Sequence, residues 1–178
     1  VRIYFKGRPS PAEIVVKAQP FIAQDRRIVL GNEPNLPQEG FHGDANDYWD
    51  WFKECCQLAP DADFYSAAPS PGVPGWEKYY EHPGANFAYG RTVHAYGSLQ
   101  QIKDICWLAL TSLPSRKGCP IWLTEYNWGA GNQVDVTAWA EATIRPLHEW
   151  LESLWGYESA IFFAFKWPHP DSGQGGTP

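Results

Sequence analysis

The feature of this sequence that most constrains its fold is the alternation of short apolar runs with helical patterns. Each run is continuously apolar, which is typical of parallel strands buried on both faces. Between the runs, apolar residues recur at helical spacing. The expected strands are residues 1–5, 27–30, 63–66, 87–93, 120–124 and 160–165. The expected helices are residues 10–22, 44–58, 98–113 and 135–154.

Capping signals mark where the helical stretches begin. Two pairs, Ser10 with Glu13 and Ser98 with Gln101, have the spacing of a capping box, in which each side chain bonds the backbone amide of the other residue. Acidic residues from Asp44 onward offer an N-cap to another helix. Pro20 lacks an amide donor, so it is expected to kink or end the first helix.

Strict β-then-α order predicts an α/β fold, either an open doubly wound sheet or a barrel. The first strand is followed by no G-x-G-x-x-G and the chain has no G-x-x-x-x-G-K-[ST], so nucleotide binding lacks its main support. A length of 178 residues indicates one domain. We expect it to span residues 1–170, with residues 171–178 as a mobile Gly/Pro-rich tail.

Charge and cysteine usage exclude several partners and cofactors. The net charge is -6, and the basic residues are scattered among acidic ones, which argues against nucleic acid and anionic membranes. No apolar run is long enough to cross a bilayer. The four cysteines lack zinc-site spacing, so we expect neither a metal nor another cofactor. They are expected as buried apolar residues, with a disulfide from Cys106 to Cys55 or Cys56 as the alternative.

Polar residues follow the expected strands directly. Glu33, His94, Glu125 and Trp167 each come where an apolar run ends. In both α/β architectures the carboxyl ends of the strands gather the chemistry. Two carboxylates at strand ends can act as the pair of a retaining glycosidase, which needs them about 5–5.5 Å apart. The alternative is that both glutamates are ordinary loop residues.

Taken together, four motifs resemble the clan A glycoside hydrolases, the retaining (β/α)8 enzymes that include cellulases, mannanases and many β-glycosidases. The motifs are Asn32-Glu33-Pro34, His94-Ala95-Tyr96, Thr124-Glu125 and Trp167 after the last strand. Their order and spacing fit strands four, six, seven and eight of such a barrel. The resemblance spans roughly residues 1–170. It predicts a TIM barrel, or an incomplete barrel of about six βα units.

The resemblance also implies roles for individual residues. Glu33 would be the acid/base and Glu125 the nucleophile of a double displacement. Asn32 would hydrogen-bond the sugar 2-hydroxyl, and Tyr96 would hold the nucleophile through its hydroxyl. His94 would bind sugar or brace the glutamate pair, with a scaffold histidine as the alternative.

The 10 tryptophans divide between two expected roles. Those in helices are expected in the core or in helix packing: Trp51, Trp107, Trp139 and Trp150. Those in loops or at strand ends could offer a ring face to the C–H face of a sugar: Trp76, Trp128 and Trp167. Trp167 would be the floor of the subsite beside the cleaved bond. Trp76, with Tyr79 and Tyr80, could line an outer subsite or pack its own loop.

The chain departs from the family pattern at its start. Eight strands make a full barrel, and if Glu33 follows strand four, strands one and two have no counterpart. An arginine that the clan carries near the end of strand two therefore has no matching position; Arg2 or Arg8 could reach the site, but neither fits the motif. With Val1 first and no Met, we interpret the chain as part of a longer enzyme. A partner chain, or closure of strand three on strand eight, are the alternatives.

Three functions stay open at this stage. The first is retaining hydrolysis of a β-linked oligo- or polysaccharide, which would imply a secreted or extracellular protein. The second is a carbohydrate-binding pseudoenzyme that keeps the cleft without turnover. The third is an unrelated metal-dependent hydrolase, although the five histidines show no H-x-H or H-E-x-x-H spacing.

Overall fold

The computed structural model describes the chain except for residues 6, 38–40, 113–119, 128–135 and 155–178. The described strands are β1 (Arg2–Ile3), β2 (Ile28–Leu30), β3 (Phe64–Ser66), β4 (Gly90–Tyr96) and β5 (Ile121–Asn127). The helices are α1 (Pro11–Ile22), α2 (Ala45–Leu58), α3 (Lys78–Glu81), the 3₁₀ turn η1 (Pro83–Phe87), α4 (Leu99–Thr111) and α5 (Val136–Ser153). The expected strand 160–165 and the tail 171–178 lie outside the described residues.

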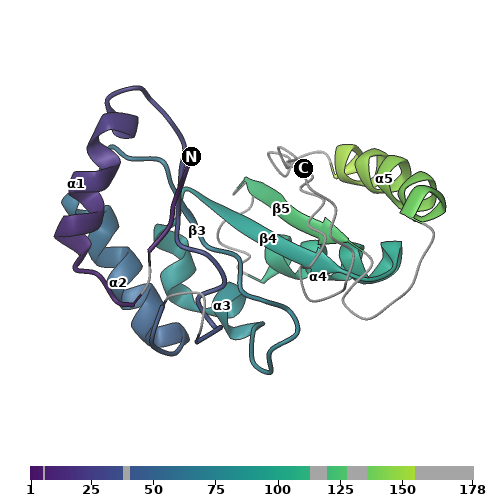
Figure 1. Cartoon of the computed structure of the whole chain (residues 1–178), viewed down its shortest axis with the longest axis horizontal. Helices are drawn as coiled ribbons and strands as arrows, with labels where there is room; N and C mark the ends of the chain where they lie inside the picture. Colours follow the sequence, from purple (N-terminus) through teal and green to yellow (C-terminus); the bar gives the residue numbers. More distant parts are fainter. Residues whose placement is uncertain (6, 38–40, 113–119, 128–135, 155–178) are drawn as a thin grey trace.

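The five described strands form one parallel sheet whose spatial order is the order of the chain, β1-β2-β3-β4-β5. A doubly wound sheet reverses its strand order at a switch point, and a barrel does not. The sheet curls with its helices on the outside, α1 and α2 beside the short strands and α4 and α5 beside the long ones (Figure 1). The fold is therefore an incomplete α/β barrel, as the sequence predicts.

Side-chain caps begin the helices where the sequence predicts them. Complete capping boxes start α1 at Ser10, α2 at Asp44 and α4 at Ser98. Pro20 was expected to kink or end the first helix, and α1 ends two residues after it, at Ile22. A proline this close to a helix end removes one bond while the next amides still find acceptors, as Ala23 N–H does at Gln19 O over 3.0 Å.

Two separate apolar cores hold the helices on the outer face of the sheet. The first core packs α1 and α2 against β1, β2 and β3, with Phe52 and Ile14 at its centre. The second core packs α4 and α5 against β4 and β5, with Ile102 and Leu123 at its centre. A third, small cluster of Val29, Tyr65 and Trp122 faces the other side of the sheet. That inner side is where a barrel carries its site.

The segment between β3 and β4 is more ordered than the sequence predicts. Trp76 was expected in a loop together with Tyr79 and Tyr80, but this segment contains α3 and leads directly into η1. Tyr79 and Tyr80 are buried, at 5% and 1% exposure, and Trp76 packs edge-on against Tyr80 at 5.9 Å between ring centroids. Of the two readings of Trp76, the structure supports packing within its own segment.

The strand after this segment starts later than expected. β4 was predicted over residues 87–93 and runs from Gly90 to Tyr96, because η1 extends through Phe87. Gly90 pairs with Tyr65, whose ring lies over it; a Cβ at this position would come 2.2 Å from the Tyr65 ring. Glycine, which has no Cβ, therefore allows β4 to start pairing with β3 at this position.

The helical tryptophans do not all lie in the core. Trp51 is 3% exposed and packs against Phe5 and Phe41, as predicted. Trp139 and Trp150 pack at the margin of the second core. Trp107 is 45% exposed, so it does not lie in the core.

The cysteines behave as apolar core residues. Cys55, Cys56 and Cys106 are free thiols, so the alternative disulfide is not formed; Cys119 lies outside the described residues. Burial raises the pKa of Cys55 and of Cys106 to about 12, which keeps both thiols protonated and unreactive. Among the helices in the described part of the chain, none has the length and apolarity needed to cross a membrane.

Candidate active site

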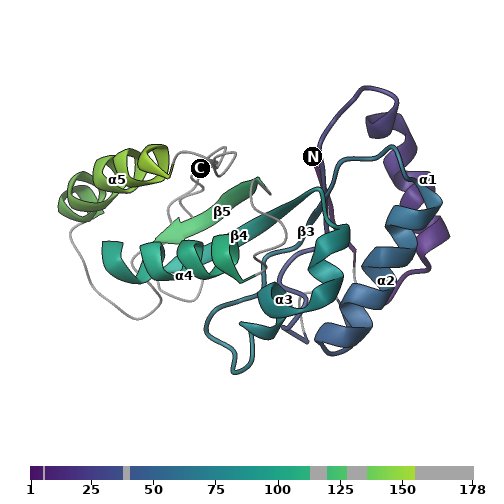
Figure 2. The same cartoon turned by 180° about the vertical axis from the view of Figure 1, so that it is seen from behind.

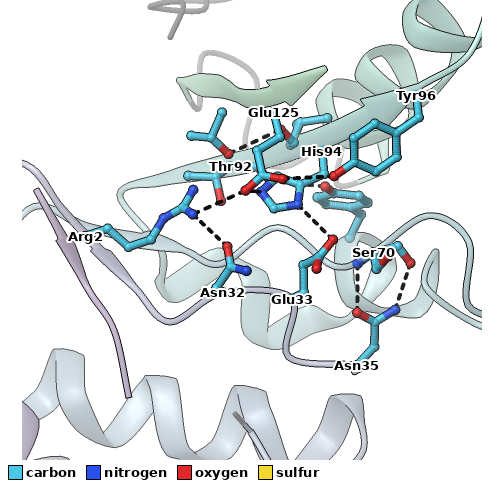
Figure 3. Close-up of polar contacts among 12 residues, drawn as sticks. Arg2, Asn32, Glu33, Asn35, Ser70, Thr92, His94, Tyr96 and Glu125 are labelled. Carbon is cyan, nitrogen blue, oxygen red and sulfur yellow. Dashed lines mark hydrogen bonds and ion pairs between the residues drawn. The ribbon is translucent and has the colours of Figure 1, made fainter. Parts of the chain in front are cut away.

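The carboxyl ends of the strands bring six predicted or newly found polar residues together on the inner side of the sheet (Figure 3). They come from β1 (Arg2), the turn after β2 (Asn32 and Glu33), β4 (His94 and Tyr96) and β5 (Glu125). Trp128 and Trp167, which were predicted as sugar platforms, lie outside the described residues. The remaining predicted site residues converge.

Glu33 sits in a strained turn directly after β2. Its φ of 33° is in the left-handed region, which costs a residue with a Cβ about 1–2 kcal/mol. The turn is held by Asn35, whose side chain donates to Ser70 O at 2.9 Å and accepts from Ser70 N–H at 2.7 Å. This clamp ties the turn to the segment after β3, so the Glu33 side chain is fixed at 13% exposure.

His94 lies between the two glutamates and is fully buried. Its Nδ1 is 3.1 Å from Glu33 Oε1, in a hydrogen bond, and its Nε2 is 3.3 Å from Glu125 Oε1 without hydrogen-bond geometry. The sequence placed His94 just after its strand, but it lies within β4, because β4 extends to Tyr96. An imidazole with 0% exposure braces the pair and has no free surface to stack on a sugar.

Tyr96 fixes the orientation of Glu125. Its hydroxyl donates to Glu125 Oε2 at 3.0 Å (Figure 3). Burial raises the pKa of Tyr96 well above its ordinary value, and the negative charges of Glu125 and Glu33 raise it further. The phenol therefore stays protonated and donates to Glu125.

A β-bulge in β5 decides which way Glu125 faces. The sequence placed Glu125 after its strand, but β5 extends to Asn127. Leu123 pairs with Val93, and Glu125 with His94, so Thr124 is an extra residue in the ladder. Plain alternation would put Glu125 on the same face as Leu123, which lies in the second core. The bulge turns it to the inner face instead.

Arg2 is the site residue that the sequence motifs did not assign. Its Nη1 donates to Asn32 Oδ1 at 2.7 Å and lies 3.5 Å from Glu125 Oε1. It reaches the site from β1, one strand away from the position where the clan carries its arginine. Arg8 instead pairs with Asp47 at 2.9 Å, on the outside. The feature that points to Arg2 is strand register. Arg2 pairs with Val29, whose side chain lies on the inner face of the sheet.

The two carboxylates lie close enough to act on one bond. Glu33, Glu125 and His94 each present one polar atom, and these three atoms lie within 4.8 Å of one another. Two carboxylates and an imidazole are also ligands for a divalent cation. The Arg2 guanidinium beside Glu125 opposes that use, because it places a positive charge where the cation would sit.

Comparison with known proteins bears on the fold. No family profile and no curated protein matches the sequence. A GH128 (subgroup III) curdlan-specific exo-β-1,3-glucanase from Blastomyces gilchristii is similar in structure, with a TM-score of 0.62 and 21% identity, over 92% of this chain and 72% of that chain. A GH39 enzyme from Xanthomonas axonopodis pv. citri has a TM-score of 0.59 and 15% identity, over 90% of this chain and 39% of that one.

A GH39 β-xylosidase from Caulobacter crescentus is similar too, with a TM-score of 0.57 and 12% identity, over 92% of this chain and 41% of that one. This chain thus spans about two fifths of the two GH39 enzymes and less than three quarters of the glucanase. The fold is that of the clan A glycoside hydrolases, present here as a curled part-barrel of parallel strands. The resemblance predicted from the motifs is confirmed at the level of the fold.

Proposed function

We propose that this protein hydrolyses a β-glycosidic bond with retention of configuration, using Glu125 as nucleophile and Glu33 as acid/base. The observation that carries the proposal is the pairing of these two carboxylates at His94, on the inner side of a glycoside hydrolase fold. Strained or buried polar groups gathered at strand ends are typical of active sites. Ordinary loop glutamates would not share one buried imidazole.

The separation of the carboxylates supports retention over inversion. A retaining pair stands about 5–5.5 Å apart, whereas an inverting pair stands about 6.5–9.5 Å apart to admit a water molecule. Here one oxygen of Glu33 lies within 4.8 Å of one oxygen of Glu125. That gap suits direct attack by one carboxylate on the anomeric carbon.

The proposed reaction has two balanced steps. Glu125 attacks the anomeric carbon and forms a glycosyl ester, while Glu33 gives its proton to the leaving oxygen as the glycosidic bond breaks. Glu33, now ionised, takes a proton from water; the water oxygen bonds the anomeric carbon and Glu125 leaves as a carboxylate. Glu33 ends protonated, so the site is restored.

Neighbouring side chains would prepare Glu125 for attack. Tyr96 donates to one oxygen, and Arg2 places a positive charge near the other. Both contacts limit rotation of the carboxylate. Asn32, whose Oδ1 accepts from Arg2, is held in one orientation and would meet the sugar 2-hydroxyl. Trp128 and Trp167 would provide sugar platforms.

The names of the structural neighbours support a proposal for the substrate class. The similar structures are named a curdlan-specific exo-β-1,3-glucanase and a β-xylosidase. We propose a β-linked glucan or xylan chain as substrate, and consequently a secreted or extracellular protein. A further chain segment or partner would complete the barrel that the described strands begin.

The test is turnover of aryl β-glucosides, aryl β-xylosides and polysaccharides by wild type, Glu125→Gln and Glu33→Gln. Glu125→Gln should lower kcat/KM on every substrate by roughly 10⁴-fold, because no nucleophile replaces it. Glu33→Gln should cost about 10²–10⁴-fold on poor leaving groups and little on activated aryl groups. Glu54→Gln, on the exposed side of α2, is the matched control. Unchanged turnover in both site variants rules the proposal out.

Two readouts separate the alternatives. A 2-deoxy-2-fluoro glycoside should leave a covalent adduct on Glu125, which a pseudoenzyme would not form. Sugar binding with no turnover by wild type supports the pseudoenzyme instead. If activity disappears with a chelator and returns with zinc, Glu33, His94 and Glu125 are acting as metal ligands, and the glycosidase mechanism fails.

A further inference from the structure

The Glu33 turn, residues 31–36, leaves the sheet at the point where β2 stops pairing with β3. The last pair in this ladder is Leu30 with Ser66. Gly31 then redirects the chain with a φ of 91°, a conformation that glycine adopts without steric cost. Because the ladder with β3 ends before Glu33, the position of the turn relative to β3 depends on other contacts.

Tyr48 attaches the start of the Glu33 turn to the segment after β3. It reaches the strands from α2, which lies between α1 and α3 (Figure 2). Its hydroxyl accepts from Ala67 N–H at 2.8 Å and donates to Leu30 O at 3.3 Å, and the whole residue is buried. Burial raises the pKa of Tyr48 well above its ordinary value, so the hydroxyl remains a donor. One hydroxyl thus bridges an amide and a carbonyl where direct pairing of the strands has stopped.

Asn35 attaches the other end of the Glu33 turn to the same segment (Figure 3). Its Nδ2 donates to Ser70 O at 2.9 Å, and its Oδ1 accepts from Ser70 N–H at 2.7 Å. Both groups of Ser70 belong to the backbone, so the contact fixes the path of the chain. Ser70 also begins a turn of its own, in which Val73 N–H donates to Ser70 O at 3.3 Å. Asn35 therefore joins the Glu33 turn to backbone that is itself held.

Glu33 lies between these two attachment points, and its backbone makes it sensitive to both. A φ of 33° persists only where the surrounding structure holds the chain in that conformation. If the Asn35 contact is lost, the turn can relax and carry Glu33 Oε1 away from His94 Nδ1, which is 3.1 Å from it. Misplacing a reacting group by about 1 Å can cost on the order of 10²-fold in rate. Glu125 should be spared, because Tyr96 holds it from the other half of the sheet.

We propose that Asn35 is a positioning residue for the acid/base, acting through the backbone of the Glu33 turn, with Tyr48 as the second attachment of that turn. The inference rests on the proposed function, because it assigns Asn35 to one of the two carboxylates. Glu33 acts twice, as an acid when the leaving oxygen departs and as a base when water attacks. A displaced Glu33 should therefore slow the first step for poor leaving groups and the second step for every substrate.

The test compares wild type, Asn35→Ala and Asn35→Asp on an alkyl and on a dinitrophenyl β-glycoside, with Glu33→Gln as the reference. Asn35→Ala should lower kcat/KM on the alkyl glycoside by about 10- to 100-fold. A dinitrophenolate leaves without a proton, so kcat/KM on that substrate should stay within about twofold while kcat and KM fall together as the glycosyl ester accumulates. Asn35→Asp keeps the acceptor for Ser70 N–H and should show a smaller effect of the same kind, which serves if Asn35→Ala does not fold.

Rescue by azide separates a positioning role from a merely structural one. Azide attacks the anomeric carbon of the Glu125 ester, so that a C–N bond forms and Glu125 leaves as a carboxylate, with no proton to remove. Azide should therefore restore kcat of Asn35→Ala on the dinitrophenyl glycoside and yield a β-glycosyl azide, as it should for Glu33→Gln. The matched control is Asn46→Ala, which removes another bridging asparagine of the same half, 3.0 Å from His82 Nε2. It should keep the wild-type ratio of activities on the two glycosides.

The possible outcomes distinguish this inference from the proposed function. If Asn35→Ala folds, loses activity equally on both glycosides and gains nothing from azide, Asn35 does not position the acid/base. Unchanged kinetics in both Asn35 variants overturns the inference as well. In either case the proposed function stands, provided that Glu33→Gln still discriminates between the two leaving groups. If Glu33→Gln does not discriminate, or if wild type has no turnover, the acid/base assignment fails and the role of Asn35 fails with it.

Discussion

The two halves of the sheet present the two carboxylates of the candidate site by different means. β1, β2 and β3 are two or three residues long, and Glu33 leaves β2 in a turn with φ of 33°. β4 and β5 are seven residues each, and Glu125 is delivered from inside β5 by a bulge. The first half uses a strained turn and the second half an irregular ladder. Each half has its own apolar core, and the site lies where they meet.

The two carboxylates, Glu33 and Glu125, are therefore held by contacts that cross the boundary between the two apolar cores. His94 and Tyr96 of the second half hold Glu125, and His94 also contacts Glu33 of the first half. Arg2 crosses in the opposite direction, from β1 to Glu125. Changes within one half should therefore alter one carboxylate, whereas changes in the crossing contacts should alter their separation.

The largest effect should come from Tyr96, a contact within the second half. Tyr96→Phe removes the hydroxyl that donates to Glu125 Oε2 at 3.0 Å. A hydrogen bond to a charged group contributes about 1.5–3 kcal/mol, so kcat/KM should fall by about 10- to 100-fold. Steady-state kinetics on an aryl glycoside measure this, with the unfolding midpoint as the control for folding. A fall of less than twofold would show that Tyr96 does not orient Glu125.

Replacing a buried arginine of the second half should destabilise the protein more than replacing an exposed arginine of the first half. Arg91 of β4 is 1% exposed and donates through Nη1 to Ala109 O at 2.5 Å and to Ser112 Oγ at 3.1 Å, which closes the end of α4. Arg91→Met should lower the free energy of unfolding by about 2–3 kcal/mol, because a buried carbonyl loses a charged donor. In the first half, Arg8→Met removes an exposed ion pair with Asp47 and the cation–π contact of Arg8 with Phe41, and should cost about 1 kcal/mol. Denaturant titration measures both; equal losses would contradict the contrast.

The contact that crosses the boundary should have a moderate effect. Arg2→Gln keeps a donor toward Asn32 and removes the charge that lies 3.5 Å from Glu125 Oε1. The pair is about one quarter exposed, so a loss of about 1 kcal/mol, or roughly fivefold in kcat/KM, is expected. Arg2→Lys, which keeps a positive charge, should lose less activity than Arg2→Gln. Equal losses in the two variants would make Arg2 a merely structural residue.

The positive φ of Glu33 in the first half should lower the stability of the protein. Glu33→Gly and Glu33→Ala remove the same carboxylate, and only glycine adopts a φ of 33° without cost. We expect the glycine variant to be about 1 kcal/mol more stable than the alanine variant, with both inactive on poor leaving groups. Thermal unfolding of the two variants measures this difference. Equal stability would mean that the turn carries no strain.

The smallest expected effect is a loosening of two helix starts at low pH. Backbone amide donors lower the pKa of Glu13 and of Asp44, chiefly Ser10 N–H for the first and Asp47 N–H for the second. A lowered pKa contributes stability above the ordinary carboxyl range, and this is lost as pH falls through the folded-state value. The helix starts of α1 and α2 should therefore exchange amide hydrogens faster below about pH 4. The uncharged capping box of α4, Ser98 with Gln101, is the matched control and should not change.

The sequence predicted the class of fold and the converging residues because both depend on local patterns. Apolar runs and capping boxes identified the β-then-α order, and Asn32-Glu33-Pro34 and His94-Ala95-Tyr96 identified the site. Strand ends were missed because pairing across the sheet extends β4 and β5 beyond their apolar runs. The facing of Glu125 and the approach of Arg2 depend on the bulge and on register, which no local pattern records.

The extra residue at Thr124 aims Glu125 as well as choosing its face. A β-bulge bends its strand and increases the local twist. Removing Thr124 would leave Glu125 opposite His94 and on the inner face, because regular alternation from Leu123 also places the next residue there. The bend and the extra twist would be lost, so the carboxylate would point differently toward Tyr96 and Arg2. A single-residue deletion is thus a direct way to ask whether the aim of Glu125, and not only its presence on this face, sets its chemistry.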